Sequence, residues 1–414
     1  MKVSCTQEAL SRGLGVVGRA VAARSPLPIT ANVLIQADGE RLKLSATNLE
    51  ITMSCWIDAK IEEEGAITVP ARLLGDFVNT LPNDRIALTV APRSRQVRVE
   101  CARNEATIGG LDAEDFPPTP VVKDGIDVQL DPKGLRQAIA RTVFAAATDD
   151  SRPVLTGVDT RFDARLLTLA ASDGFRLSVS KLPLDASVET TEIVIPARAL
   201  NELVRLLGRP DATRVNRIVD AQGRPIPEVS IDRGRGVEEE VTTLDEPADE
   251  PITLRTNAAK TQVQFRLPSV ELTAQLIQGT FPNFNQLIPS TYSSRAVVDV
   301  AEFLRETRIA SVFARDGSGI VRLVVTPGEG VTPGKVVVSA RAEEVGDNQG
   351  ELDAAVEGDG VKIAFNGKYL QDVLQALEGG QLAMETTGPS SQGVFRPVGD
   401  ENYVHVIMPM FVQW

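Results

Sequence analysis

One twelve-residue pattern occurs three times in the chain, as Pro70-Ala-Arg-Leu-Leu-Gly-Asp-Phe-Val-Asn-Thr-Leu81, as Pro196-Ala-Arg-Ala-Leu-Asn-Glu-Leu-Val-Arg-Leu-Leu207 and as Asn366-Gly-Lys-Tyr-Leu-Gln-Asp-Val-Leu-Gln-Ala-Leu377. Apolar residues recur in each copy at i, i+3, i+4 and i+7, which is the spacing of one buried helix face. A basic column accompanies them, made of Arg72, Arg198 and Lys368, and an acidic column is made of Asp76, Glu202 and Asp372. The pattern predicts helices over 70–81, 196–207 and 366–377.

A second set of helices is expected upstream of these, where a short strand-like segment leads into Leu10, Leu135 and Leu304. From each of these leucines to the start of the later helix the spacing is 60, 61 and 62 residues. Alternating, β-branched runs at 42–47, 166–171 and 335–340 lie between the two helices and predict strands, as do 86–90 and 97–101 further on. The sequence therefore predicts three repeated α+β domains, 1–125, 126–293 and 294–414, each with two helices and several short strands.

The second repeat holds extra sequence, which we place at about 209–250. The run Glu238–Glu250 carries seven acidic residues and no base, and Gly- and Pro-rich sequence precedes it. Such composition favours an inserted excursion that could hold a hairpin at 214–231 and a disordered acidic stretch after it. A solvated spacer without a function of its own is the alternative.

Composition excludes several classes of protein. The chain of 414 residues has a formal net charge of -13, one histidine and three cysteines. A single histidine argues against most Ser-His-Asp and Cys-His catalytic sites and against metal sites with several histidines. The sequence also contains no nucleotide-binding glycine motif. We therefore expect neither a cofactor nor a metal. Cys5, Cys55 and Cys101 are too few for a disulfide framework and fit reduced thiols in a cytoplasmic protein. No apolar run is long enough to cross a membrane, and the first residues lack a secretory pattern.

Two features that suggest chemistry have a plainer interpretation. His405 lies in an alternating apolar run and is expected to be a strand residue rather than a ligand or an acid–base group. Asp149 and Asp150 could suggest paired carboxylates, but a linker turn is favoured. A carboxylate-based hydrolase would need two convergent acids, and no spacing supports it.

Positive charge concentrates on the predicted helices even though the chain is acidic. The first helices of the three repeats carry Arg12, Arg19 and Arg24, then Lys133, Arg136 and Arg141, then Arg305, Arg308 and Arg315. Any one of these can be an ordinary solvated residue. The same polarity in three repeats would create a phosphate-attracting field if the helices line one cavity. A protein-interaction scaffold built of repeats, which uses its acidic face and does not bind DNA, is the alternative.

Several motifs resemble the bacterial DNA polymerase III beta subunits, the sliding clamps. They are Leu27-Pro-Ile, Val69-Pro-Ala-Arg, Asp115-Phe-Pro, Arg152-Pro-Val-Leu-Thr-Gly157, Ser172-Asp-Gly-Phe-Arg-Leu177, Phe281-Pro-Asn-Phe and Tyr403-Val-His-Val-Ile-Met-Pro-Met410. The resemblance covers the chain apart from the insert. It implies a non-enzymatic processivity factor in which each domain packs two helices on antiparallel sheets and two chains form a closed head-to-tail ring around duplex DNA.

The resemblance also implies roles for particular residues. It places contacts to double-stranded DNA, without sequence preference, at Arg24, Arg72 and Arg198. The positions of the family's single-strand contacts are held by Asp149, Pro153 and Val154, which are poor partners for phosphate. The homodimer interface is placed at Ala106 and Ile108 against Val312 and Phe313.

The family binds linear peptides in a cleft between its second and third domains. The partners implied are the DNA polymerase III catalytic subunit, the clamp loader and other polymerases and repair proteins, through peptides of the type Gln-x-x-Leu-x-Phe. The matching positions are Leu155, Ser172, Gly174, Phe175, Arg176, Leu177, Pro282, Gln286, Leu287, Asn366, Tyr369, Val406, Ile407, Met408, Pro409 and Met410. Gln286 stands where a base is common, and residues 411–414 could deepen the cleft or cover it.

Overall fold

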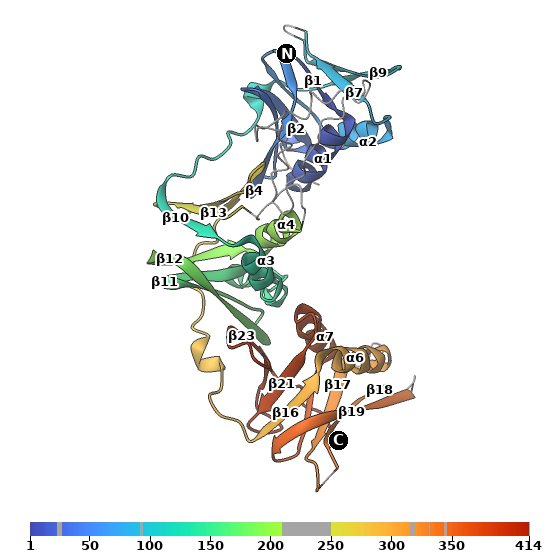
Figure 1. Cartoon of the computed structure of the whole chain (residues 1–414), viewed down its shortest axis with the longest axis vertical. Helices are drawn as coiled ribbons and strands as arrows, with labels where there is room; N and C mark the ends of the chain where they lie inside the picture. Colours follow the sequence, from blue (N-terminus) through green and yellow to red (C-terminus); the bar gives the residue numbers. More distant parts are fainter. Residues whose placement is uncertain are drawn as a thin grey trace, which may run out of the picture. The chain divides into compact units, whose positions relative to one another are not determined.

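A computed structural model describes residues 1–22, 27–91, 94–208, 250–314, 319–330, 332–342 and 346–413 (Figure 1). It contains two compact units. The first comprises residues 1–136 and 202–276, and the second comprises residues 137–201 and 277–414. The insert expected at 209–250 lies outside the described residues except for Glu250, and so do Arg24, Arg315 and Trp414.

The first unit holds two antiparallel sheets. One has the strand order β5-β1-β7-β8-β9 and the other the order β10-β13-β14-β15-β4-β3-β2-β6. The strands are β1 (Lys2–Thr6), β2 (Asn32–Asp38), β3 (Arg41–Thr47), β4 (Ile51–Asp58), β5 (Lys60–Glu63), β6 (Ala66–Pro70), β7 (Arg85–Thr89), β8 (Gln96–Cys101), β9 (Asn104–Gly109), β10 (Asp124–Leu130), β13 (Ile252–Asn257), β14 (Gln262–Arg266) and β15 (Val270–Gln275). The helices α1 (Gln7–Val17) and α2 (Ala71–Thr80) belong to this unit, and α3 (Pro132–Ala140) and α4 (Ala197–Leu207) continue from one unit into the other.

The second unit is built on one ten-stranded antiparallel sheet in the order β11-β12-β23-β22-β21-β16-β19-β18-β17-β20. Its strands are β11 (Gly157–Ser172), β12 (Arg176–Pro196), β16 (Ser294–Asp299), β17 (Ile320–Thr326), β18 (Gly334–Ala342), β19 (Gly346–Gly358), β20 (Val361–Asn366), β21 (Gln381–Thr386), β22 (Gly393–Pro397) and β23 (Tyr403–Ile407). The helices α6 (Val300–Ala314) and α7 (Gly367–Ala376) pack against each other and against this sheet.

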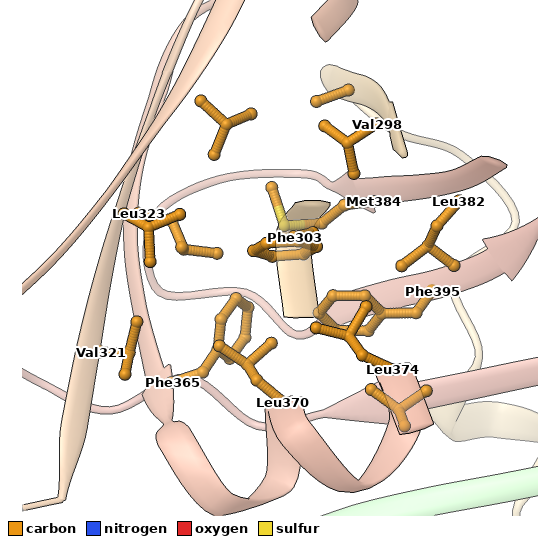
Figure 2. Packing of buried hydrophobic residues seen from close by; sticks show 14 of the residues in the cluster. Val298, Phe303, Val321, Leu323, Phe365, Leu370, Leu374, Leu382, Met384 and Phe395 are labelled. Atoms are coloured by element: carbon orange, nitrogen blue, oxygen red, sulfur yellow. The ribbon is translucent and has the colours of Figure 1, made fainter. Parts of the chain in front are cut away.

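The helices expected from the repeated pattern are confirmed as α2, α4 and α7. Their apolar stripe is buried, as at Leu74 and Val78 in α2 and at Leu370 and Leu374 in α7. Figure 2 shows Leu370 and Leu374 pointing from α7 into a cluster with Phe303, Phe365 and Phe395. The rings of Phe365 and Phe395 meet edge to face with their centroids 5.7 Å apart.

In the third repeat, the residue that matches Leu10 and Leu135 lies one position earlier than the expected Leu304. The side chains of Thr6, Asp131 and Asp299 cap their helices by accepting from a backbone N–H three residues later. Counted from this cap, Phe303 and not Leu304 matches Leu10, and Phe303 is buried whereas Leu304 is half-buried. The cap fixes where the helix begins and therefore which residue faces the core.

The strands β11 and β12 are longer than the short strands expected. They pair over most of their length, from Gly157 opposite Pro196 to Ser172 opposite Leu177. The register shifts on either side of Ala164, which has φ +51°. Bulges of this kind let one strand bend without ending, so β11 extends upstream of the strand expected at 166–171.

Strands from successive repeats join by the same kind of backbone pairing. In the first unit β15 lies antiparallel to β4, with Leu272 opposite Met53. In the second unit β23 lies antiparallel to β12, with His405 opposite Ser178. We call these pairs the first and second strand junctions. Within the described residues, β9 ends its sheet, and residues 346–353 of β19 pair with β18 alone.

Candidate functional site

Most residues of the implied peptide site belong to segments of the second unit that meet at the second strand junction. In the sheet, Leu177 of β12 lies opposite Val406 of β23. After β23 the backbone N–H of Met408 donates to the carbonyl of Phe175 at 2.8 Å, and that of Met410 donates to the carbonyl of Ala364 at 2.7 Å. The run that follows β23 is thus fixed between the β11–β12 turn and the end of β20.

The β11–β12 turn is built by its own polar side chains. The hydroxyl of Ser172 donates to the carbonyl of Arg176 at 2.7 Å, and the carboxylate of Asp173 accepts from the N–H groups of Phe175 and Arg176. Gly174 has φ +94°, and a Cβ there would lie 2.9 Å from the guanidinium of Arg152. The turn leaves Phe175 exposed to 61%.

Arg176 is a buried cation that links three segments of this site. Its guanidinium donates to Asp173 at 3.0 Å, to Asp372 of α7 at 2.6 Å and to the carbonyl of Phe144 at 2.6 Å. It also lies over the ring of Tyr369, 4.3 Å from the centroid. Burial, followed by the nearby charge of Asp173, raises the pKa of the Tyr369 hydroxyl. Arg176 is therefore satisfied inside the protein and fixes the position of α7 relative to the turn.

The apolar residues of the implied site fall into two groups. Leu155, Leu177, Val406 and Ile407 are buried, and the first three belong to one cluster with Phe281 and Phe284. The side chains that remain exposed are those of Phe175, Leu287, Met408 and Met410. The exposed group is what an incoming side chain can contact, and the buried group supports it.

The remaining positions of the site are polar or lie at bends. Pro282 and Gln286 are exposed, the latter in the short turn Asn285–Leu287, and Pro409 is half-buried. The side chain of Asn366 accepts from the N–H groups of Lys368 and Tyr369 and so caps α7. Sequence reasoning missed Phe144 and Asp372 as parts of this arrangement. For Asp372 the only signal in the sequence was its place in the acidic column, and Phe144 had none.

His405 and Asp149 have the structural roles that were expected. His405 is fully buried in β23, and its ring lies 5.4 Å from that of Phe144. Burial, with a smaller contribution from the charge of Arg176, lowers the pKa of His405 to about 3, so the ring is neutral. The carboxylate of Asp149 accepts from the hydroxyl and from the N–H of Ser151 in a local turn, and these hydrogen bonds, that of the hydroxyl first, lower the pKa of Asp149. Pro153 and Val154 begin the short 3-10 helix Pro153–Thr156.

Two of the three implied DNA-binding residues are described. Arg72 on α2 has a side chain that is 96% exposed and lies 3.9 Å from Asp76 one turn later. Arg198 is exposed on α4.

The implied dimer residues lie on β9 and α6. Ile108 is buried and Ala106 half-buried on β9, while Val312 is 58% exposed and Phe313 half-buried on α6. Of the four side chains, that of Val312 is therefore the most exposed.

The described residues contain neither a cluster of metal ligands nor a membrane-spanning helix. No group of three or more histidine, cysteine or carboxylate side chains is arranged there to hold a metal ion. No described helix is long and apolar enough to cross a membrane.

Comparisons with known proteins agree over nearly the whole chain. Family models of the DNA polymerase III beta subunit match in order: the N-terminal domain over residues 1–120, the central domain over 129–222 and the C-terminal domain over 285–411. The beta sliding clamp of Synechocystis is 29% identical over 99% of both chains, and that of Staphylococcus aureus is 28% identical over 95% of this chain and 94% of its own.

Solved structures agree as well. The DNA polymerase sliding clamp of Bacillus subtilis superposes with a TM-score of 0.85 at 25% identity and covers all of both chains. The beta sliding clamp of Caulobacter crescentus gives a TM-score of 0.82 at 25% identity, over 100% of this chain and 99% of its own. The chain therefore belongs to the DNA polymerase III beta subunit family, the bacterial sliding clamps.

Proposed function

We propose that this sliding clamp works as a closed ring of two chains joined head to tail, which encircles duplex DNA and holds partner proteins by short peptides. It needs no catalytic group, because enclosure of the DNA supplies the persistence of binding. The observation that carries the proposal is the strand junction, which the chain uses twice. β9 is the last strand of the first repeat, as β15 and β23 are of the second and third, and the start of β19 holds the place in the third repeat that β4 and β12 hold in the first two. The first repeat therefore offers one strand for a further junction, β9, and the third repeat offers the other, the start of β19.

A head-to-tail contact between unlike surfaces either closes into a ring or continues as a fibre. Three repeats per chain and the same junction throughout favour closure at two chains. If the register is repeated, Ala106 lies opposite Asn348 of the partner subunit, because Leu272 lies opposite Met53 and His405 opposite Ser178. The side-chain oxygen of Asn348 is buried and has no donor among the described residues, which supports a partner there.

Sedimentation tests the ring. The wild type should be a dimer at micromolar concentration, and Val312→Asp should shift it to monomer, because the contact would have to bury an unpaired charge. Val398→Asp is the matched control, since Val398 is also exposed in the second unit, to 48%. A wild-type monomer at that concentration contradicts the proposal.

We further propose that Arg72 and Arg198, together with Arg24, attract DNA phosphates without reading sequence. Arg72→Ala should weaken loading on circular duplex DNA and reduce the salt slope by roughly one unit for each phosphate that the side chain no longer neutralises. Arg165→Ala, which removes an exposed arginine of β11, should leave both unchanged. Equal effects of the two variants would favour the alternative of a scaffold that does not use its helices to bind DNA.

The proposed partner site comprises the exposed side chains Phe175, Leu287, Met408 and Met410 over the buried cluster of Leu155, Leu177 and Val406. A peptide of the type Gln-x-x-Leu-x-Phe should bind there with about micromolar affinity, since ordering of the peptide offsets apolar burial. Enclosure of DNA keeps a bound partner at high effective concentration, so weak binding is sufficient. Flexible methionines suit a site that accepts several sequences.

Calorimetry with that peptide tests the site. Met408→Glu should weaken binding at least tenfold, because a carboxylate would replace an apolar contact. Val398→Glu changes a side chain of nearly equal exposure, 48% against 46% for Met408, and should have no effect. Unchanged affinity after Met408→Glu would place the partner site elsewhere.

A further inference from the structure

The acidic column Asp76, Glu202 and Asp372 occupies the same position on α2, α4 and α7, and two of its members are held by an arginine from the preceding repeat. Glu202 lies 3.7 Å from Arg19, which follows α1. Asp372 lies 2.6 Å from Arg176. Their side chains are only 12% and 21% exposed. Each also pairs with a base on its own helix, Arg205 or Lys368.

Asp76 has the base on its own helix, but no second arginine pairs with it within the described residues. Arg72 lies 3.9 Å away, and the side chain of Asp76 is 75% exposed. The position three residues before the acidic one differs in exposure in the same way. Leu73 on α2 is 55% exposed, whereas Ala199 on α4 is fully buried. One face of α2 is therefore uncovered at the positions that are covered on α4.

We propose that Asp76 and Leu73 dock on helix α6 of a second copy of this chain, and that Asp76 pairs there with Arg308 of the partner subunit. The inference rests on the proposed ring, in which the first repeat of one chain follows the third repeat of the other. The second copy is the occupant because the two filled positions are both filled by the preceding repeat.

The choice of Arg308 follows from the helix caps. Arg19 lies as far beyond the cap Thr6 as Val312 lies beyond the cap Asp299, so the α6 position that corresponds to Arg19 is apolar. Arg308 lies one turn before Val312 on the same exposed face. It makes no ion pair within the described residues, whereas Arg305 on that face is paired with Glu306.

A charge swap between two variants tests the pairing. Asp76→Arg alone places two arginines together at both contacts of the ring, and Arg308→Asp alone places two carboxylates together. Each should weaken the dimer about tenfold or more, because both contacts turn from attraction to repulsion. In an equimolar mixture, a heterodimer of the two variants joins an arginine to an aspartate at both of its contacts. Heterodimers should therefore form in preference to either homodimer, and the preference should shrink at high salt.

Native mass spectrometry of the mixture measures this preference, with Glu40→Arg as a control that makes the same charge change at an exposed turn of the first unit. Preferential heterodimers with Arg308→Asp, absent when Glu40→Arg replaces Asp76→Arg, support the pair. A dimeric wild type whose single variants dimerise normally and mix at random overturns this pair and leaves the ring intact. A monomeric wild type overturns the ring itself and the pair with it.

Discussion

The two strand junctions use the same antiparallel pairing but bury different side chains. At the first, Met53 lies opposite Leu272 and both are fully buried apolar residues. At the second, the corresponding pair is Ser178 and His405, and buried Arg176 lies two residues before Ser178. Backbone pairing and apolar packing hold the first junction, and the one ion pair described between those two repeats, Arg19–Glu202, is partly exposed. The second has in addition a polar network that fixes a turn, a helix and a run of exposed apolar side chains, which is what a binding site requires.

Removal of Arg176 should have the largest effect on this difference. Arg176→Ala leaves the largely buried carboxylate of Asp173 without its cation and leaves Asp372 paired only with Lys368, which costs about 3 kcal/mol in the free energy of unfolding. Hydrogen exchange should accelerate in β12 and β23 and remain slow in β4 and β15. A variant with wild-type exchange at the second junction would mean that this junction does not need the buried cation.

An effect of intermediate size on stability is expected when His405 of the second junction is replaced by leucine, the residue at the matching position of the first. The unfolded state protonates His405 below pH 6.5, while the buried ring stays neutral down to about pH 3. Unfolding therefore takes up a proton in that window, so stability falls as the pH falls, by about 1.4 kcal/mol per pH unit.

His405→Leu installs the counterpart of Leu272 and should remove this contribution. Urea denaturation at pH 7 and pH 5 measures the slope, and near pH 7 the two proteins should respond alike to a small change of pH. A leucine variant that loses as much stability as the wild type between these pH values would assign the slope to other groups.

The smallest effect is expected at the ion pair of the first unit. Arg19 is 40% exposed and lies 3.7 Å from Glu202, so Arg19→Ala should cost less than about 1 kcal/mol. Circular dichroism melts of Arg19→Ala and Arg176→Ala, run side by side, compare the two arginines directly. Equal shifts in melting temperature would remove the distinction drawn between them.

The sequence predicted what depends on local period and missed what depends on distant contacts. The helices α2, α4 and α7 follow from apolar spacing, and the buried positions Leu177 and Val406 follow from alternation together with the family resemblance. The contacts of Arg176 with Phe144 and Asp372 join segments far apart in the chain, and no spacing reports them. The sequence placed Leu304 at the core-facing position of α6, but Phe303 occupies it, because a capping side chain and not the apolar pattern determines where α6 begins.

Pairing across repeats also bears on the order in which the chain is made. β4 ends at Asp58, and its neighbour β15 begins at Val270, so more than 200 residues are synthesised before that edge is covered. At ~5–20 residues per second the delay is roughly 10–40 seconds. During that time an apolar strand edge is open to pairing with another nascent chain. The first repeat must therefore remain soluble on the ribosome with its sheet incomplete, and expression at low temperature or with a chaperone should improve the yield of folded protein.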